Sequence, residues 1–189
     1  MARLEQVHDG TPVDMPALNA AQQVAADAIG GAQGFTPLLL YGVTGSGKTE
    51  VYLQACAQVL AREDDAQILI LVPEINLTPQ LEGNIRTRFP GVMLATLHSS
   101  LSEGERGLHW IAAHQGRARI VLGTRLAILA SLPNLKLIVI DAASEAEAIS
   151  TAVRGGWRVL AVDDSGAADS AAVARPGKQG RVRRAWRWT

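Results

Sequence analysis

The chain has 189 residues, enough for one domain with a substantial core or for one domain and a tail. Hydrophobic residues make up 48% and charged residues 19%, a balance that excludes an intrinsically disordered chain. The formal net charge is zero, which argues neither for nor against a nucleic-acid partner. No run approaches the roughly 20 apolar residues of a membrane span, so we expect no membrane partner. The first ten residues lack a signal-peptide pattern, and we therefore expect a cytoplasmic protein.

The amino-terminal part of the chain changes from irregular to helical near residue 18. Residues 1–17 mix charges with glycine and prolines without periodicity, and we expect a flexible lead-in. Leu18–Ile29 then has apolar or small residues at helical spacing, with Asn19 as the predicted N-cap. Gly30 and Gly31 follow and are predicted to end this helix.

The central part of the chain alternates short apolar runs, predicted to be buried strands, with longer segments of helical spacing. The predicted strands are Pro37–Tyr41, Gln67–Val72, Val92–Thr96, Arg119–Leu122 and Leu135–Ile140, and the predicted helices are Lys48–Arg62, Leu77–Phe89 and Ser102–His114. This alternation predicts an α/β fold with a parallel sheet. Ligands of such sheets bind beyond the carboxyl ends of the strands, so the loops there are the candidate site.

The loop after the first predicted strand carries a complete phosphate-binding motif. The sequence GVTGSGKT fits G-x-x-x-x-G-K-[ST], between an apolar strand and a helix-forming segment. Its glycines let backbone N–H groups approach a phosphate, and the start of the following helix adds positive potential. The predicted nucleotide-binding residues are Gly42, Val43, Thr44, Gly45, Ser46, Gly47, Lys48 and Thr49. We expect Lys48 to bridge the β- and γ-phosphates of ATP, and Thr49 to ligate Mg²⁺.

Asp141 ends the last apolar strand, LKLIVI. An acidic residue at the end of a buried strand is unfavourable unless it faces a cation, and this one emerges at the ligand-binding edge of the sheet. It is therefore predicted to hold Mg²⁺ through water, opposite Thr49. The alternative is an aspartate that caps the next helix.

Several segments together resemble the primosomal protein N′ family, superfamily 2 DNA helicases that restart stalled replication forks. The resemblance covers residues 36–141 and rests on GVTGSGKTEVYLQ, LVPEINLTPQ, LHSSLSEGER, IVLGTR and LIVID, with LNAAQQ upstream. It implies that residues 18–141 form a RecA-like helicase lobe with ATP and Mg²⁺ as cofactors. It also implies ATP-driven 3′-to-5′ unwinding, with single-stranded or forked DNA and primosome proteins as partners.

The resemblance assigns further site residues. Gln22 corresponds to the glutamine that reads the adenine edge. The expected DNA-contacting residues are Pro73, Glu74, Gly123, Thr124 and Arg125. A Gly-Thr-Arg sequence at a strand end offers a backbone, a hydroxyl and a guanidinium, which are groups that hold phosphates without reading bases.

The catalytic and zinc-binding parts of the family pattern are missing from this sequence. Ala142 stands where the family has the glutamate that polarises the attacking water. The second lobe, which supplies the arginine finger, and the cysteine-rich zinc module are not in these residues either. Cys56 is the single cysteine and is predicted to be buried, and His98 has no companion ligands, so we expect no zinc site. We therefore expect no complete catalytic site and negligible turnover.

The composition changes at Asp141. Ala, Arg and Gly account for 24 of the 48 residues after it, as in out-of-frame translation of a GC-rich gene. We expect residues 142–189 to be a degenerate or out-of-frame tail, mostly disordered; a diverged tail is the alternative. Reading the gene in its other two frames distinguishes them. Arg158–Asp163 is a candidate strand that could fill the gap between the P-loop strand and the Asp141 strand.

Two other functional classes fit part of the pattern. One is a non-catalytic module that binds nucleotide and single-stranded DNA. The other is a different P-loop enzyme, such as a small-molecule kinase, which the VPE and GTR segments disfavour because a kinase needs an acceptor pocket and lid arginines.

Overall fold

The computed structural model describes residues 15–43, 45–73, 78–141 and 158–161. The predicted lead-in over residues 1–14 and the predicted tail over 142–157 and 162–189 lie outside the described residues, as do Thr44 and Glu74. The helices are α1 (Ala20–Gly30), α2 (Lys48–Arg62), α3 (Pro79–Arg88), α4 (Glu103–His114) and the 3₁₀ helix η2 (Arg125–Leu129). The strands are β1 (Leu38–Tyr41), β2 (Gln67–Leu71), β3 (Leu94–Leu97), β4 (Ile120–Gly123), β5 (Leu135–Ile140) and β6 (Arg158–Ala161).

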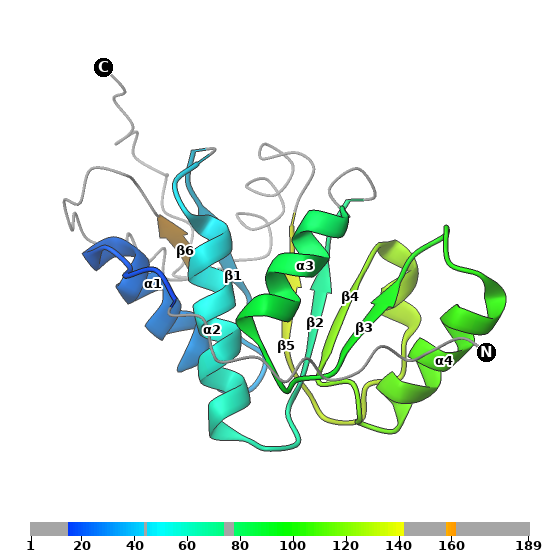
Figure 1. Cartoon of the computed structure of the whole chain (residues 1–189). Helices are drawn as coiled ribbons and strands as arrows, with labels where there is room; N and C mark the ends of the chain where they lie inside the picture. Colours follow the sequence, from blue (N-terminus) through cyan, green and yellow to red (C-terminus); the bar gives the residue numbers. More distant parts are fainter. Residues whose placement is uncertain (1–14, 44, 74–77, 142–157, 162–189) are drawn as a thin grey trace, which may run out of the picture.

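The strands form two parallel sheets with helices packed against them (Figure 1). The larger sheet has four strands in the order β3-β4-β2-β5, and the smaller one pairs β1 with β6. In the larger sheet Leu71 of β2 lies opposite both Gly123 of β4 and Ile140 of β5, so these strands end at the same edge. The prediction of an α/β fold with parallel strands separated by helices is confirmed.

The predicted strand forms over its described residues, Arg158–Ala161, but only part of its predicted role is met. β6 pairs in parallel with β1, with Leu38 opposite Arg158 and Tyr41 opposite Ala161. Among the strands that the structure describes, β6 pairs with β1 and none joins β1 to β5, so the prediction that this segment fills the gap between the P-loop strand and the Asp141 strand is wrong. The strand before the P-loop is therefore connected to the larger sheet by α2 rather than by β-pairing.

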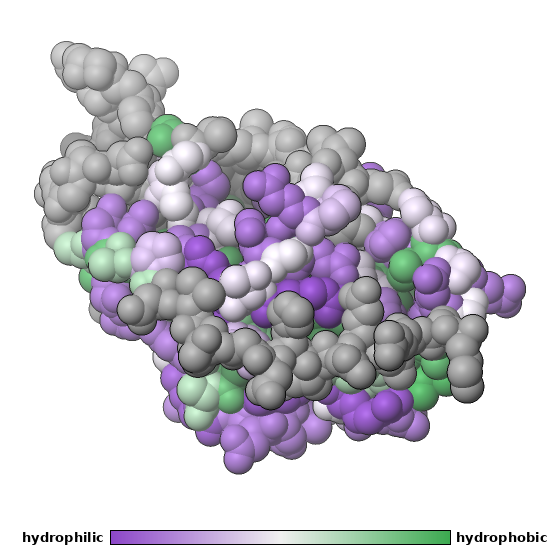
Figure 2. Space-filling model, in the orientation of Figure 1, coloured by the Kyte–Doolittle hydropathy of each residue, from purple (hydrophilic) through white to green (hydrophobic). Residues whose placement is uncertain are grey.

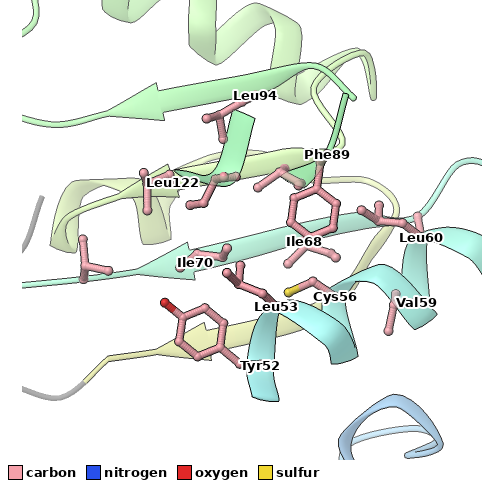
Figure 3. Close-up of a cluster of buried hydrophobic side chains, with 14 residues drawn as sticks. Tyr52, Leu53, Cys56, Val59, Leu60, Ile68, Ile70, Phe89, Leu94 and Leu122 are labelled. Carbon is pink, nitrogen blue, oxygen red and sulfur yellow. The ribbon is translucent and has the colours of Figure 1, made fainter. Parts of the chain in front are cut away.

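The centre of the core is β2, whose five residues are all buried. One face of β2 packs against α2 and α3 through a cluster that includes Ile68, Ile70, Cys56 and Ile85 (Figure 3). The other face packs against α4 through a second cluster, which includes Leu69 and Leu71. A strand that is covered on both faces reads as a continuous apolar run, which is why QILIL was recognisable in the sequence.

Local signals set most helix boundaries. Asn19 caps α1, as predicted, and also forms a reciprocal capping box with Gln22; Ser102 and Glu105 form a second capping box at the start of α4. α3 begins at Pro79, behind Thr78 as N-cap, because the fixed φ of proline suits the first position of a helix. η2 was not predicted, since five residues are too few to show helical periodicity.

The outer surface over α2 and α3 is mainly hydrophilic. In Figure 2 hydrophobic residues on this face are confined to small, scattered patches. Among the helices that the structure describes, none is long and apolar enough to cross a membrane.

Candidate nucleotide-binding site

The phosphate-binding motif occupies the turn between β1 and α2, as predicted. Gly45 and Gly47 have φ values of +89° and +78°, in the left-handed region that favours glycine. Gly47 is the N-cap of α2, and Lys48 and Thr49 open the helix. The first N–H groups of α2 therefore point into the loop, where a phosphate would meet them and the positive end of the helix dipole.

The Lys48 side chain folds back over this loop. Its ammonium group donates hydrogen bonds to the carbonyl oxygen of Gly42 and, at 2.8 Å, to that of Val43. These oxygens occupy the ammonium in the way that phosphate oxygens would, because a lysine offers three donors and no acceptor. The lysine is thus placed at the loop where the motif requires it.

Gln22 joins α1 to the same loop. Its side-chain oxygen accepts from the Asn19 N–H at 2.9 Å, and its side-chain nitrogen donates to the Ser46 carbonyl at 3.0 Å. Each end of the amide thus has one partner and keeps one further hydrogen-bonding position. The edge of adenine offers one acceptor and one donor, which match the remaining N–H and the remaining lone pair of the Gln22 amide. The geometry is therefore compatible with the adenine-reading role that the resemblance implies for Gln22.

Thr49 is the second residue of α2, just after the P-loop, and Asp141 directly follows β5, whose carboxyl end lies at the upper edge of the sheet in Figure 1. Both side chains are exposed, and the Asp141 N–H donates to the Leu71 carbonyl at 2.8 Å. In the described part of the chain, no group of three or more His, Cys, Asp or Glu side chains could hold a metal ion by itself. A cation bound to one hydroxyl and one carboxylate would need oxygen ligands from a phosphate and water, as Mg²⁺ commonly has.

A buried tyrosine lies one turn after Thr49 on α2. Tyr52 is 8% exposed, and burial raises the pKa of its phenol to about 12. A side-chain hydrogen bond with Thr49 acts in the opposite direction and lowers this pKa, whereas the charge of Asp141 raises it further. Next to this group, Arg88 at the end of α3 forms an ion pair with Glu50, which directly follows Thr49.

The predicted DNA-contacting residues follow β2 and β4 at the same edge of the sheet, but they are not equally accessible. Gly123 and Thr124 are buried, and the Thr124 N–H donates to the Leu97 carbonyl at 3.1 Å. A Cβ on Gly123 would lie 2.4 Å from that carbonyl oxygen and 2.5 Å from the Ala127 side chain, so this glycine is required by internal packing. Arg125 is exposed, and Pro73 is partly buried.

Residues 19–154 match the family model of the DEAD/DEAH box helicases. The chain belongs to this family. It is 49% identical over 126 residues to the replication restart protein PriA of Synechocystis, and these residues make up 67% of this chain and 15% of that protein. It is 50% identical over 103 residues to PriA of Bacillus subtilis, over 54% of this chain and 12% of that protein.

A solved structure supports the fold of this DEAD/DEAH box helicase lobe. The DUF1998 helicase MrfA bound to DNA superposes with a TM-score of 0.58 at 15% identity, covering 79% of this chain and 28% of that chain. The RecA-like fold and the resemblance to the replication-restart helicases are thus confirmed. The chain spans less than a fifth of the length of the PriA proteins named above.

Sequence reasoning missed three contributors to the helicase site. Asn19 was predicted as a cap, yet its spacing to Gln22 is also a capping-box pattern that would have predicted the fixed glutamine. Tyr52 follows Thr49 by three residues, a spacing that places both on one face of a helix. The Glu50–Arg88 pair spans 38 residues and left no local signal in the sequence.

Proposed function

We propose that this lobe binds ATP with Mg²⁺ as the nucleotide-binding part of a 3′-to-5′ DNA helicase that acts in replication restart in the cytoplasm. The observation that carries the proposal is the loop between β1 and α2. There, two left-handed glycines, the start of a helix and the Lys48 ammonium converge, with Gln22 attached to the Ser46 carbonyl. The identity to PriA proteins supports replication restart, primosome proteins and forked DNA as the setting.

Nucleotide binding is tested by titrating the protein with a fluorescent ATP analogue in the presence of Mg²⁺. Lys48→Ala removes charge-assisted contacts to the phosphates, and we expect an affinity loss of about 10- to 100-fold. Lys136→Ala is the matched control, since this exposed lysine lies at the opposite end of β5 and pairs with Glu63. Wild-type protein that is folded and ignores millimolar ATP contradicts the proposal.

We further propose that these 189 residues do not turn over ATP at helicase rates on their own. Ala142 replaces the family's glutamate, and a general base contributes about 10²- to 10⁴-fold to the rate. An arginine finger, which the other lobe supplies, contributes about 10³- to 10⁵-fold. The measurement is phosphate release with and without single-stranded DNA. Stimulated hydrolysis at several turnovers per second is the result that contradicts this part of the proposal.

The alternative is a non-catalytic module that holds nucleotide and single-stranded DNA, and the exposure of Arg125 is the observation that favours DNA contact. A guanidinium at this edge binds phosphates regardless of sequence. Arg125→Ala should weaken binding of a fluorescent oligonucleotide and reduce the slope of log K against log salt by about one. Arg117→Ala is the matched control, because Arg117 is an exposed arginine at the amino end of β4. Equal losses in both variants indicate nonspecific attraction.

A further inference from the structure

The helix α1 carries Gln22 and lies beside α2 (Figure 1). The Gln22 amide is held in one orientation, because its oxygen accepts from the Asn19 N–H and its nitrogen donates to the Ser46 carbonyl. If the amide turned over, two donors would meet at one contact and two acceptors at the other. On the edge that carries N7, adenine presents an acceptor and a donor, whereas guanine presents two acceptors. The free donor and acceptor of Gln22 therefore suit adenine better than guanine.

The position of this amide depends on how α1 as a whole is held. Because the amide oxygen is bonded to the N-cap of its own helix, the amide moves with α1. The buried contact between the two helices is made by small side chains, Ala25 and Ala26 from α1 and Val51 from α2. Packed helices are kept in register by ridges of side chains that fill facing grooves, and alanines form shallow ridges. Apolar packing therefore resists a small shift of α1 along α2 only weakly.

A polar contact at the other end of α1 supplies a stronger constraint. Gln58 of α2 donates from its side-chain nitrogen to the Asp27 carboxylate at 3.0 Å, which is a charge-assisted hydrogen bond. The same amide lies against the buried Gly30, where an added Cβ would be 1.9 Å from the Gln58 oxygen. Alanine is ordinarily more favourable than glycine in a helix, so this glycine provides space for the amide. Gln54, one turn earlier on α2, donates to the Pro16 carbonyl at 2.8 Å and holds the segment before α1.

We propose that Gln58 is a positioning residue for base selection: it holds the last turn of α1 and so keeps the Gln22 amide at the P-loop, where it reads adenine. Gln22 and Gly30 are about 12 Å apart along the helix axis. The contacts at Ser46 and at Gln58 thus hold α1 at two separate points, whereas either one alone would let the helix pivot. This inference rests on the proposed binding of ATP.

The test measures the affinities for fluorescent analogues of ATP and GTP, with Mg²⁺, in wild type and in Gln58→Ala. We expect the ATP affinity to fall about two- to fivefold, as for part of one hydrogen bond, and the GTP affinity to stay unchanged. The phosphates are held by the P-loop in both cases, so only the base contact responds. Gln22→Ala removes the amide itself and gives the full loss of selectivity for comparison.

Gln23→Ala is the matched control. Gln23 donates to the same Asp27 oxygen at 2.9 Å, but it does so from within α1. Its loss removes one hydrogen bond of similar length and leaves the two helices connected. The ratio of ATP to GTP affinity should therefore stay at its wild-type value.

Gly30→Ala tests the same contact from the other helix. The new methyl group displaces the Gln58 amide without removing it, so we expect the same loss of ATP selectivity. In the Gln58→Ala background there is no amide to displace, and Gly30→Ala should have little further effect on selectivity. Full and additive losses in the double variant would show that the two residues act independently and would overturn the inference.

Three further results separate this inference from the proposed function. Wild-type selectivity in Gln58→Ala, or equal losses of ATP and GTP affinity, overturns the inference and leaves the proposed function standing. Wild-type protein that binds ATP and GTP equally well also overturns it, because there is then no base selection to support. Wild-type protein that binds neither nucleotide overturns both.

Discussion

The two sheets of the lobe differ in how they are held. β2 of the larger sheet is buried along its whole length, with a paired strand on each side and helices over both faces. β1 of the smaller sheet is only partly buried at each of its four residues and pairs with β6. The P-loop thus follows the less buried strand, and the rigid core of the lobe lies beside it.

The connection between the two regions is α2. Val51 packs against α1 and β1, whereas Tyr52, Leu53 and Cys56 pack against the larger sheet. A loop attached through one helix can rearrange around a phosphate without disturbing a central strand. Regions with fewer buried contacts also open at lower free energy, which suits a segment that must bind and release a ligand.

The strongest test of this comparison truncates the penultimate residue of each strand. Ile70→Ala in β2 removes a fully buried side chain, and we expect it to lower the free energy of unfolding by about 2–5 kcal/mol. Leu40→Ala in β1 removes a partly buried side chain and should lower it by less. Urea denaturation measures both variants. Equal losses in the two would mean that β1 belongs to the same cooperative core as β2.

A second prediction concerns the polar anchor of the larger sheet. The fully buried Gln67 amide donates to the carbonyls of Ala113 and Ala118, at 2.8 and 2.9 Å, and accepts from the Asn134 N–H at 3.1 Å. Gln67→Leu removes the side-chain partner of the Ala118 carbonyl and the Asn134 N–H, whereas the Ala113 carbonyl still accepts from the Gly116 N–H at 3.1 Å. We therefore expect a loss of about 1–3 kcal/mol in urea denaturation. Gln23→Leu, on the exposed side of α1, is the control and should be near neutral. Similar stability of both variants would show that water replaces the lost partners.

These two regions also show what the sequence could reveal. The start of α2 at Lys48 and the bounds of β5 were predicted correctly, because glycines, an apolar run and an aspartate mark them locally. The Gln67 network was not predicted, since its partners lie 46 to 67 residues away and the residue looked like the edge of an apolar strand. The pairing of β6 with β1 could not be predicted from the local pattern either, because the two strands lie far apart in the sequence.

The same limit applied to the site. The P-loop was identified from one continuous motif, and so were the positions of Lys48 and Thr49. Gly123 was interpreted as a backbone approach to DNA, yet its immediate neighbours are the Leu97 carbonyl and Ala127. A glycine at a strand end has the same sequence signature whether a ligand or another strand comes close.

A third prediction sharpens the comparison at the P-loop itself. Gly47→Ala and Gly45→Ala would each strain the backbone, because both glycines have a positive φ. Only at Gly47 would the new Cβ lie 2.5 Å from the Gln22 side-chain nitrogen, whereas nothing lies within 4 Å at Gly45. Gly47→Ala should therefore bind ATP about fivefold more weakly than Gly45→Ala, the equivalent of one lost hydrogen bond. Equal affinities would show that the contact between Gln22 and the loop contributes nothing to binding.

The smallest predicted effect uses the pH dependence of the helix that joins the two regions. Burial raises the pKa of the Cys56 thiol from its ordinary 9.0 to about 12. Between pH 9 and 12 the thiol thus stays protonated in the folded chain but ionises in the unfolded chain. The contribution of this thiol to the free energy of unfolding is therefore fully present below pH 9 and is lost as the pH rises toward 12. The slope for one group is at most about 1.4 kcal/mol per pH unit.

Between pH 9 and 10 this slope can be assigned to Cys56, because the ordinary pKa of Tyr52, the other buried group with a raised pKa, is 10.0. Urea midpoints measured across this interval should fall in the wild type and fall less steeply in Cys56→Ala, whatever that variant's absolute stability. Equal slopes would mean that the thiol reaches water before the sheet unfolds. In that case α2 would separate from the larger sheet by local unfolding. The packing of α2 on β2 would then open at as low a free energy as the region that carries the P-loop.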